Sequence, residues 1–425
     1  MADETLEQSR QGERRARKPA PGVAVVYANR PVLLARSLAR GTLTLGRGDD
    51  ASLVVSDPKL SRRHVELARD GGALTARDLG SRNGSTGDGL PLGDAPRAVR
   101  VVRAGDTIAV LVADVSPLVD GAVQLDGDAV IGPTLRAAYD AIAAAARDGS
   151  GLHLTGETGS GKELAARHFH AEGPRASGPF VAVNCAALPA SLAERLLFGA
   201  RRGAYSGADT DTEGHLQAAD GGTLLLDEIA ELSLDVQAKL LRALESREVL
   251  ALGATRPRAI DVRVCSATHV DLRAAVAAGK FRQDLYFRLA RPAVALPALR
   301  ERPEDLPWLV CGALARQPAQ LAAHASLVEA ALLRPWPGNV RELVTEVADA
   351  ARRARTAGAT RVEAAHLADD AGRPLEGEAA AAPAAIDDAA IDAALARNAG
   401  NVSQAARELG LHRTQLRRLL ARRGG

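Results

Sequence analysis

The stretch "GLHLTGETGSGKE", residues 151–163, places a short apolar run directly before a glycine-rich turn and then a lysine that opens "KELAARHFH". The pattern predicts a strand, a loop and a helix. In such a loop the backbone N–H groups converge on phosphate oxygens, the helix N-terminus adds partial positive charge, and the lysine reaches the β- and γ-phosphates. We therefore expect a nucleotide site formed by Gly156, Glu157, Thr158, Gly159, Ser160, Gly161, Lys162 and Glu163.

Glu163 departs from the usual pattern of a phosphate loop, which has Ser or Thr at this position to bind magnesium. The metal must therefore be held elsewhere, and "GGTLLLDEIAEL", residues 221–232, supplies the group. An apolar strand that ends in Asp227 and Glu228 puts carboxylates at the carboxyl edge of the sheet. We expect Asp227 to hold Mg²⁺ through water and Glu228 to polarise the attacking water. The alternative is that both are helix-capping charges.

Length and composition indicate a soluble protein of several domains. The chain of 425 residues is too long for one core, and its 46% hydrophobic and 25% charged residues are ordinary for globular proteins. No apolar run of about 18 residues occurs, so we expect neither a signal peptide nor a membrane span, and a cytoplasmic location. Cys185, Cys265 and Cys311 are far apart and odd in number, which argues against a disulfide framework or a metal cluster.

The composition changes along the chain and suggests domain boundaries. Residues 1–20 are polar and aperiodic, typical of a disordered arm. Residues 21–118 alternate short β-rich runs with turns, which predicts an all-β sandwich, and residues 119–130 form a linker. Residues 131–302 alternate apolar strands with helical stretches, which predicts an α/β domain with a parallel sheet. A helical lid is expected over residues 303–368, a second linker over 369–383 and an all-α helical domain over 384–425.

The motifs of residues 131–345 resemble the AAA+ domain of the bacterial enhancer-binding proteins, the ATPases that activate sigma-54 RNA polymerase. Beside "GETGSGKE" and "GGTLLLDEI", the chain has "FVAVNCAAL", "GAYSGA", "FRQDLYFRL", "LPALRERPEDL" and "WPGNVREL", in the family's order. The resemblance implies an AAA+ P-loop ATPase with an α-helical lid that uses ATP and Mg²⁺. It also implies a homo-oligomer, a hexameric ring, because arginines of this family reach the γ-phosphate bound by a neighbouring subunit.

The resemblance also implies roles for individual residues. "GAYSGA" corresponds to the family's sigma-54 contact loop, with Tyr and Ser where the family has Phe and Thr. His269 stands at the sensor I position, where the family usually has Asn, and its protonation would make turnover pH-dependent. The sigma-54 contact loop is Gly203, Ala204, Tyr205, Ser206, Gly207 and Ala208; Asn184 holds Glu228 away from water, Arg282 and Arg288 are the arginine fingers, and Arg341 senses nucleotide from the lid.

The N-terminal segment "LTLGRGDDASLVVSDPKLSRRHVEL…DLGSRNGST" resembles a forkhead-associated domain, a β-sandwich that binds phosphothreonine peptides. The resemblance implies that Arg47 and Ser61 clamp the phosphate through charge-assisted hydrogen bonds and that Arg62 adds charge. Asn83 would fix the peptide backbone, and His64 would hold the geometry of the loops. The alternative is a sandwich whose loops contain Arg and Ser incidentally.

The C-terminal stretch "NAGNVSQAARELGLHRTQLRRLLARRG" predicts a short helix, a turn at Gly410 and a basic second helix. These are the dimensions of a helix-turn-helix, and the stretch is similar to the Fis-type DNA-binding end of the same activators. The tail from Arg397 carries seven arginines against Glu408. Candidate contacts with upstream enhancer DNA are His412, Arg413, Thr414, Gln415, Arg417 and Arg418. The alternative is a solvated helical hairpin.

Together these features predict an activator of sigma-54 RNA polymerase that binds enhancer DNA, hydrolyses ATP and is controlled by a phosphothreonine-containing partner, with no membrane involved. Two other classes remain open. One is an AAA+ remodeller of a different client protein, with "GAYSGA" as an ordinary pore loop. The other is a DNA-bound scaffold that reads phosphothreonine without turnover.

Overall fold

The computed structural model describes residues 19–374, except 40, 71, 150 and 205–208, and residue 398. The chain divides into two compact units, residues 1–373 and 374–425. Nearly all described residues lie in the first unit, so the predicted C-terminal helices and the arm over residues 1–18 fall outside the described part. No described helix has the length and apolar character needed to cross a membrane.

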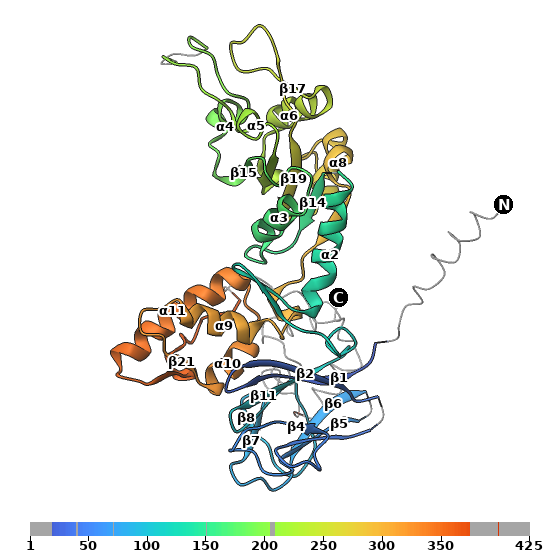
Figure 1. Ribbon diagram of the computed structural model, residues 1–425, viewed down its shortest axis with the longest axis vertical. Helices are drawn as coiled ribbons and strands as arrows, with labels where there is room; N and C mark the ends of the chain where they lie inside the picture. The colour runs from blue at the N-terminus through green and yellow to red at the C-terminus, as the bar shows by residue number, and fades with distance from the viewer. Residues whose placement is uncertain are drawn as a thin grey trace, which may run out of the picture. The chain divides into compact units, whose positions relative to one another are not determined.

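The N-terminal domain is the predicted β-sandwich (Figure 1). One sheet has six strands in the order β2-β1-β11-β10-β7-β8, and the other has five in the order β4-β3-β5-β6-β9. The strands are β1 Gly22–Ala28, β2 Pro31–Ser37, β3 Leu43–Gly46, β4 Leu53–Val54, β5 Val65–Asp70, β6 Ala73–Asp78, β7 Ser85–Gly87, β8 Leu90–Pro91, β9 Arg97–Ala98, β10 Val101–Ala104 and β11 Thr107–Val112.

The segment between the sandwich and the ATPase core was expected to be a linker, and it contains a two-stranded hairpin. Strands β12 (Gln124–Asp126) and β13 (Ala129–Ile131) pair antiparallel. The turn between them has Gly127 in a left-handed conformation, which glycine adopts without steric cost. Ala129 and Ile131 are buried in the core of the following domain, so the hairpin belongs structurally to that domain.

The ATPase core is the predicted parallel sheet, in the order β15-β16-β19-β14-β20. Its strands are β14 Leu152–Thr155, β15 Phe180–Asn184, β16 Thr223–Asp227, β19 Arg263–Thr268 and β20 Ala293–Ala295. Every pairing in this sheet is parallel, so the carboxyl ends of all five strands meet at one edge. Helices α2 and α3 pack against β14, α4 and α5 lie near β15, and α6 and α8 pack against each other (Figure 1).

The helices and short strands of the core connect these five strands. They are α2 Pro133–Arg147, α3 Lys162–Ala171, η1 Cys185–Ala187, α4 Ala190–Phe198, α5 His215–Ala218, η2 Ile229–Glu231, α6 Leu234–Ser246, β17 Glu248–Val249, β18 Arg258–Ala259, α7 Leu272–Ala277, α8 Gln283–Leu289 and η3 Leu299–Glu301.

The lid is helical, as predicted, and also contains one parallel strand pair. Its elements are α9 Leu306–Ala315, β21 Ala322–Ala323, α10 Ala325–Leu332, α11 Asn339–Thr356, β22 Arg361–Val362 and η4 Ala364–His366. Helix α9, "LPWLVCGALA", is apolar on nearly all sides because α10, α11 and β21 pack around it. Helix α11 is amphipathic, with charged residues on its exposed side.

Candidate nucleotide site

The glycine-rich loop lies where its sequence predicts, between the carboxyl end of β14 and the first turn of α3. Gly161 caps α3 in a left-handed conformation, so the loop turns sharply into the helix. Gly159 also has a positive φ of 75°, and a Cβ there would lie 2.2 Å from the carbonyl oxygen of Gly338. The lid therefore abuts the loop at a point where only a glycine fits.

Lys162 lies inside the loop with 6% of its surface exposed. Its Nζ donates hydrogen bonds to the carbonyl oxygens of Gly156, at 2.9 Å, and Glu157, at 3.3 Å, and lies 3.6 Å from Oε1 of Glu228. The structure thus brings together the loop lysine and the strand-end carboxylate, which are 66 positions apart by their numbers, 162 and 228. A buried ammonium group held by carbonyl oxygens is positioned for exchange onto phosphate oxygens.

Glu228 is held by His269. Strand β16 lies beside β19 in parallel register, so the residues that follow the two strands are neighbours. Oε2 of Glu228 accepts hydrogen bonds from Nδ1 of His269, at 2.7 Å, and from its backbone N–H, at 3.3 Å. Burial acts to raise the pKa of Glu228, but the His269 hydrogen bond and the Lys162 charge outweigh it and keep the pKa below the ordinary value.

Asp227 has the opposite shift. Burial, and then the adjacent charge of Glu228, raise the pKa of this carboxyl. A cation near Asp227 would reverse that shift, because positive charge favours the ionised acid. The two neighbouring carboxyl groups therefore have different electrostatic environments: contacts with Lys162 and His269 favour the ionised form of Glu228, whereas burial and the Glu228 charge disfavour that of Asp227.

Asn184, predicted to restrain Glu228, occupies a different position in the hydrogen-bond network. Its Oδ1 accepts the backbone N–H of Ala186 and so caps the short helix η1. In the strand register Asn184 pairs with Asp227. The carboxylate of Glu228 is restrained by His269 in this structure, and a role for Asn184 stays a prediction.

Asn339 of the lid and two arginines at the end of the ATPase core hold the phosphate loop, and sequence reasoning gave none of the three a role. Asn339, fully buried, donates from Nδ2 to Oε2 of Glu157, at 3.0 Å, and to the carbonyl of Thr158, at 3.1 Å. Arg300 donates to both carboxylate oxygens of Glu157, at 2.8 and 2.6 Å, and Arg302 donates to the carbonyl of Ser160, at 2.7 Å. The sequence did carry a signal for these residues, because they belong to two of the motifs that mark the family resemblance, "LPALRERPEDL" and "WPGNVREL".

The loop retains one polar atom that fits a ligand. Oγ of Ser160 is buried and has no hydrogen-bond partner among the described residues. Buried polar atoms are nearly always satisfied, so this hydroxyl fits a phosphate oxygen or a metal-bound water. Arg341 follows Asn339 in the first turn of α11, and its Cβ lies 3.2 Å from the position that a Cβ on Gly159 would occupy. The predicted lid arginine thus stands beside the loop.

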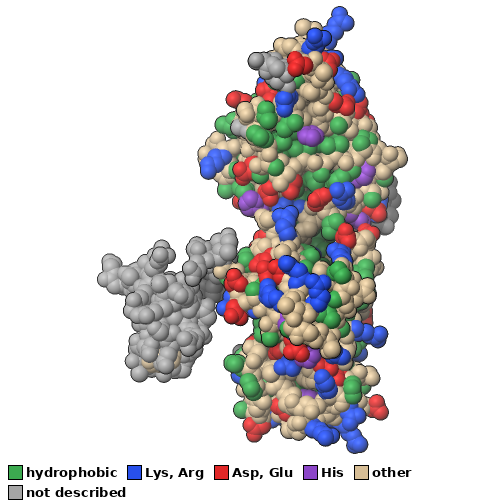
Figure 2. Space-filling model, turned by 90° about the vertical axis from the view of Figure 1, so that its left-hand side faces the viewer, with side chains coloured by type: hydrophobic (Ala, Val, Ile, Leu, Met, Phe, Trp, Pro, Cys, Tyr) green, Lys and Arg blue, Asp and Glu red, His purple; other side chains and the backbone are tan. Residues whose placement is uncertain are grey.

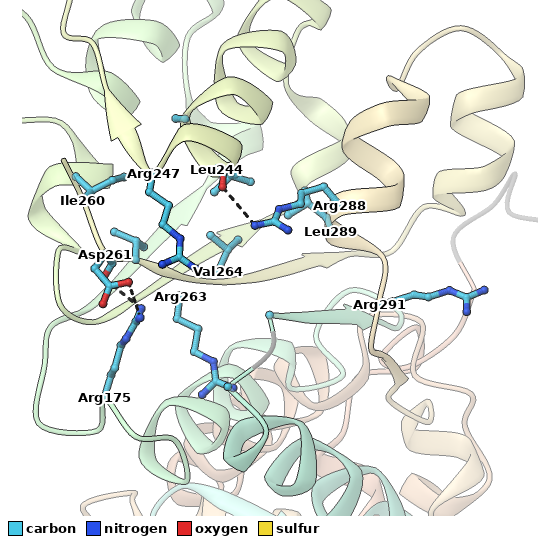
Figure 3. A pocket seen from close by; sticks show the side chains of 14 residues that line it. Arg175, Leu244, Arg247, Ile260, Asp261, Arg263, Val264, Arg288, Leu289 and Arg291 are labelled. Atoms are coloured by element: carbon cyan, nitrogen blue, oxygen red, sulfur yellow. Dashed lines mark hydrogen bonds and ion pairs between the residues drawn. The ribbon is translucent and has the colours of Figure 1, made fainter. Parts of the chain in front are cut away.

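Arg282 and Arg288 make no recorded contact with the phosphate loop of their own chain. Arg282 is bound to Asp284, at 2.7 and 3.0 Å, and Arg288 donates to the carbonyl of Leu244, at 3.3 Å. Figure 3 shows Arg288 pointing into a cavity of about 360 Å³ at the amino-terminal side of the sheet. Among the described residues that line it, Asp261 is the one acid, and the arginines are Arg175, Arg247, Arg263, Arg288 and Arg291.

The predicted sigma-54 contact loop is described only at Gly203 and Ala204; Tyr205, Ser206, Gly207 and Ala208 lie outside the described residues. The base of the loop is an antiparallel bridge, with reciprocal hydrogen bonds between Ala200 and Thr212 of 2.8 and 3.0 Å. Asp211 accepts the backbone N–H of Arg202, at 2.8 Å, and pairs with the side chain of Arg201. The chain segments on either side of residues 203–208 are therefore held together at their base.

The sandwich brings its four predicted peptide-binding residues together on adjacent loops. The backbone N–H of Arg47 donates to the Ser61 carbonyl at 3.0 Å, and Oγ of Ser61 accepts the N–H of Arg82 at 3.2 Å. Asn83 donates to the Lys59 carbonyl at 2.7 Å. Arg47, Arg62 and Asn83 are exposed and Ser61 is half-buried, so all four remain accessible to a ligand.

His64 holds these loops from beneath and is fully buried. Its Nδ1 accepts the backbone N–H of Ser61 at 3.0 Å, which places the proton on Nε2, where it is donated to the carbonyl of Gly84 at 3.1 Å. One imidazole therefore ties the Ser61 loop to the Asn83 loop, which is the role that the sequence predicted for it.

Comparisons with known proteins agree with this geometry. Residues 130–295 match the model of the Sigma-54 interaction domain, and residues 43–110 match the FHA domain. Residues 382–422, almost all outside the described part, match the model described as Bacterial regulatory protein, Fis family. The crystal structure of NtrX from Brucella abortus in complex with ATP is 30% identical with a TM-score of 0.52, over 71% of this chain and 70% of that one.

The chain belongs to the sigma-54-dependent transcriptional activators. It is 44% identical over 284 residues to the hydrogenase transcriptional regulatory protein HoxA of Bradyrhizobium diazoefficiens, covering 63% of this chain and 58% of that protein. It is 44% identical over 235 residues to the DNA-binding transcriptional regulator NtrC of Escherichia coli, covering 52% of this chain and 49% of that protein. The chain thus spans less than two thirds of these curated activators.

Proposed function

We propose that this activator hydrolyses ATP and uses the energy to open promoters bound by sigma-54 RNA polymerase. The observation that carries the proposal is the convergence of Lys162, Glu228 and His269 at the end of a P-loop sheet, with Glu228 ionised and 3.6 Å from the lysine. An ionised carboxylate at this edge is the base that polarises a water for attack on the γ-phosphate.

Nucleotide binding rests on the loop and on the lid. ATP would lie against the backbone N–H groups of residues 156–161, with Lys162 on its β- and γ-phosphates and Arg341 reaching it from α11. Mg²⁺ would be held by Asp227 through water and by phosphate oxygens, which suits a loop that carries Glu163 instead of a hydroxyl. Among the described residues no group of three His, Cys, Asp or Glu could hold a metal ion.

Turnover would require a ring, proposed here as a hexamer. Arg282 and Arg288 are exposed and lie away from their own phosphate loop, so they are placed to supply charge to a neighbour. The core also exposes large apolar side chains, with Phe287 69% and Leu192 37% exposed. Figure 2 shows hydrophobic side chains gathered on one face of the ATPase core among acidic and basic ones. Exposed apolar patches of this kind support subunit contacts.

The contact loop and the Fis-type end would bind sigma-54 and DNA, and the FHA domain would receive the regulatory signal. The loop at residues 203–208 would contact sigma-54, and the Fis-type end would bind enhancer DNA and raise the local concentration of the ring at the promoter. The FHA domain would bind a phosphothreonine-containing protein through Arg47, Ser61, Arg62 and Asn83. This arrangement predicts a cytoplasmic regulator.

The experiment is a joint measurement of ATP hydrolysis and open-complex formation at a sigma-54 promoter for the wild type, Glu228→Gln and Ser206→Ala. We expect the wild type to hydrolyse and melt, Glu228→Gln to do neither, and Ser206→Ala to hydrolyse without melting. Wild-type hydrolysis without melting at any sigma-54 promoter would instead favour a remodeller of another client. Absence of hydrolysis would favour a DNA-bound scaffold.

A further inference from the structure

The FHA domain and the ATPase lid share one hydrophobic core. Along β1, Val23 and Val25 are buried inside the sandwich, whereas Ala24 and Val26 are buried in a cluster with lid residues. Strand β11 follows the same alternation: Ala109 and Leu111 face the sandwich, and Ile108 and Val110 the lid cluster. The lid side of that cluster includes Leu309, Val310, Leu327, Val328, Ala331 and Leu332 of α9 and α10. The sheet face of the FHA domain is therefore covered by the lid.

A polar latch accompanies this apolar contact. Glu329 of α10 is 6% exposed. Both hydrogen-bond partners of its carboxylate belong to the FHA domain. Oε2 accepts Nε of Arg103 at 2.6 Å, and Oε1 accepts the hydroxyl of Thr86. Tyr27 donates its hydroxyl to the carbonyl of Ala323 at 2.9 Å. Because Glu329 is buried in the docked arrangement, removing either partner would leave its carboxylate without a compensating contact there.

The latch lies next to the predicted peptide site. Thr86 follows Asn83 by three positions and begins strand β7 with Ser85. A cavity of about 440 Å³ lies beside these residues. On the FHA side it is lined by Lys59, Asn83 to Thr86, Arg103 and Asp106. Its lining also includes His324 from the lid, whose Nε2 lies 3.8 Å from Oδ1 of Asp106.

The same lid reaches the nucleotide. Helix α9 packs against both α10 and α11, and α11 begins with Asn339, which is hydrogen-bonded to the phosphate loop. The packed helices of the lid therefore connect His324, at the peptide cavity, with Asn339, at the phosphate loop. Packed interfaces of this kind shift between discrete arrangements instead of deforming continuously.

We infer that the phosphopeptide site of this protein is composite, with FHA loops on one side and His324 of the lid on the other, so that peptide binding is read directly by the ATPase lid. The inference rests on the proposed phosphothreonine binding. A peptide held by Asn83 extends into the cavity and contacts both walls, so it binds tightly only while the lid is docked. Linkage then requires that the bound peptide stabilise docking by the same factor.

The test uses the full-length chain and a phosphothreonine peptide selected on the wild type from a degenerate array, with its unphosphorylated form as the reference. Peptide affinity and the effect of peptide on ATP turnover are both measured. The variants are Arg47→Ala for the phosphate clamp, His324→Ala for the lid wall, Glu329→Gln and Thr86→Val for the latch, and Asp369→Lys as an exposed charge change directly after the lid.

We expect Arg47→Ala to abolish binding and Asp369→Lys to change nothing. His324→Ala and Glu329→Gln should weaken the peptide on the order of tenfold, within the range of known coupling free energies, and should remove its effect on turnover. Thr86→Val, which deletes only a hydroxyl partner of the latch, should show a smaller loss in the same direction and separates undocking from misfolding.

Two results would overturn the inference and differ from each other. If the lid and latch variants bind the peptide as the wild type does, the site is not composite, and phosphothreonine binding by the FHA domain still stands. If no phosphothreonine peptide binds the wild type, the proposed FHA function fails and the composite site fails with it.

Discussion

At the scale of single residues, the decisive feature is the partnership of Glu228 with His269. The left-handed backbone of Glu228, with φ of 52°, turns its carboxylate toward the residue after β19. The sequence marked His269 as a departure from the family's usual asparagine, and the structure gives that departure a contact, a 2.7 Å hydrogen bond to the predicted base. A histidine therefore keeps this carboxylate ionised despite its partial burial.

This contact predicts the pH dependence of turnover. The pKa of Glu228 in the folded protein is lowered, so the carboxylate works above that pKa and is lost as the pH falls through it. In His269→Ala the side-chain hydrogen bond to Glu228 is lost while its burial remains, so the acid limb of the kcat profile should move up by about one pH unit, since a hydrogen bond to a charged group contributes roughly 1.5–3 kcal/mol. His269→Asn, which keeps an N–H donor, is the control. Coincident acid limbs for wild type and His269→Ala would contradict the assignment.

At the scale of elements, the contact between α11 and the phosphate loop joins the lid to the candidate nucleotide site. The loop is a turn between a strand and a helix, and its glycines were recognised from spacing alone. The helix that meets it comes from residues 339–356, far along the chain, and its first residues reach Glu157 and Thr158. Nucleotide binding and lid position are thus linked through Asn339 and Gly159.

This contact predicts the effect of Gly159→Ala. The new Cβ would meet the carbonyl of Gly338 at 2.2 Å, so α11 would have to move away from the loop. Gly149→Ala is the matched control, because Gly149 has the same φ of 75° and open space around its Cβ position. Both variants should lose about 1–2 kcal/mol of unfolding free energy from the left-handed backbone.

Only Gly159→Ala should lose ATP affinity, on the order of tenfold, since overpacking costs roughly 1–3 kcal/mol. The measurements are denaturant unfolding and titration with a fluorescent ATP analogue. Equal ATP affinities for the two variants would show that the lid contact does not support nucleotide binding.

At the scale of the whole molecule, the candidate ATPase residues of one chain lie at two separate places. Lys162, Glu228 and His269 meet in the described part of the chain, whereas Arg282 and Arg288 lie on another side of the domain. The arginine-lined cavity beside Arg288 has one acid among its described lining residues, so its charge favours an anionic neighbour. A ring of subunits would bring such a neighbour.

The ring predicts complementation between two inactive variants. Glu228→Gln lacks the base, and Arg288→Ala lacks a finger, so each alone should have negligible turnover. In an equal mixture about a quarter of the sites combine an intact Glu228 with an intact Arg288 from the neighbour, and turnover should recover to about that fraction of wild type. The assay is ATP hydrolysis after mixing, with each variant alone as the baseline. Absence of recovery would indicate that Glu228 and Arg288 act together from a single chain and not across two subunits.

The fold classes, and the positions of many candidate site residues at strand ends and in loops, could be predicted because they depend on short-range signals. Glycine spacing, an apolar strand ending in Asp227-Glu228, and turns between β-rich runs are local patterns, and each fixes a backbone shape with little help from the rest of the chain. The hairpin over 124–131 was missed because its residues are read as a linker until the ATPase core buries Ala129 and Ile131.

By itself, the sequence determined which elements form and which chemical groups stand at the ends of the strands. The tertiary structure alone decided their partners: His269 with Glu228, Asn339 with the phosphate loop, and the lid with the FHA sheet. The sequence did contain a sign that both faces of the first FHA strand are covered. The segment "GVAVVYA" is apolar without alternation, as strands buried on both faces are. The pattern shows that both faces are covered, but only packing between distant segments, driven by burial of their apolar surfaces, specifies what covers them.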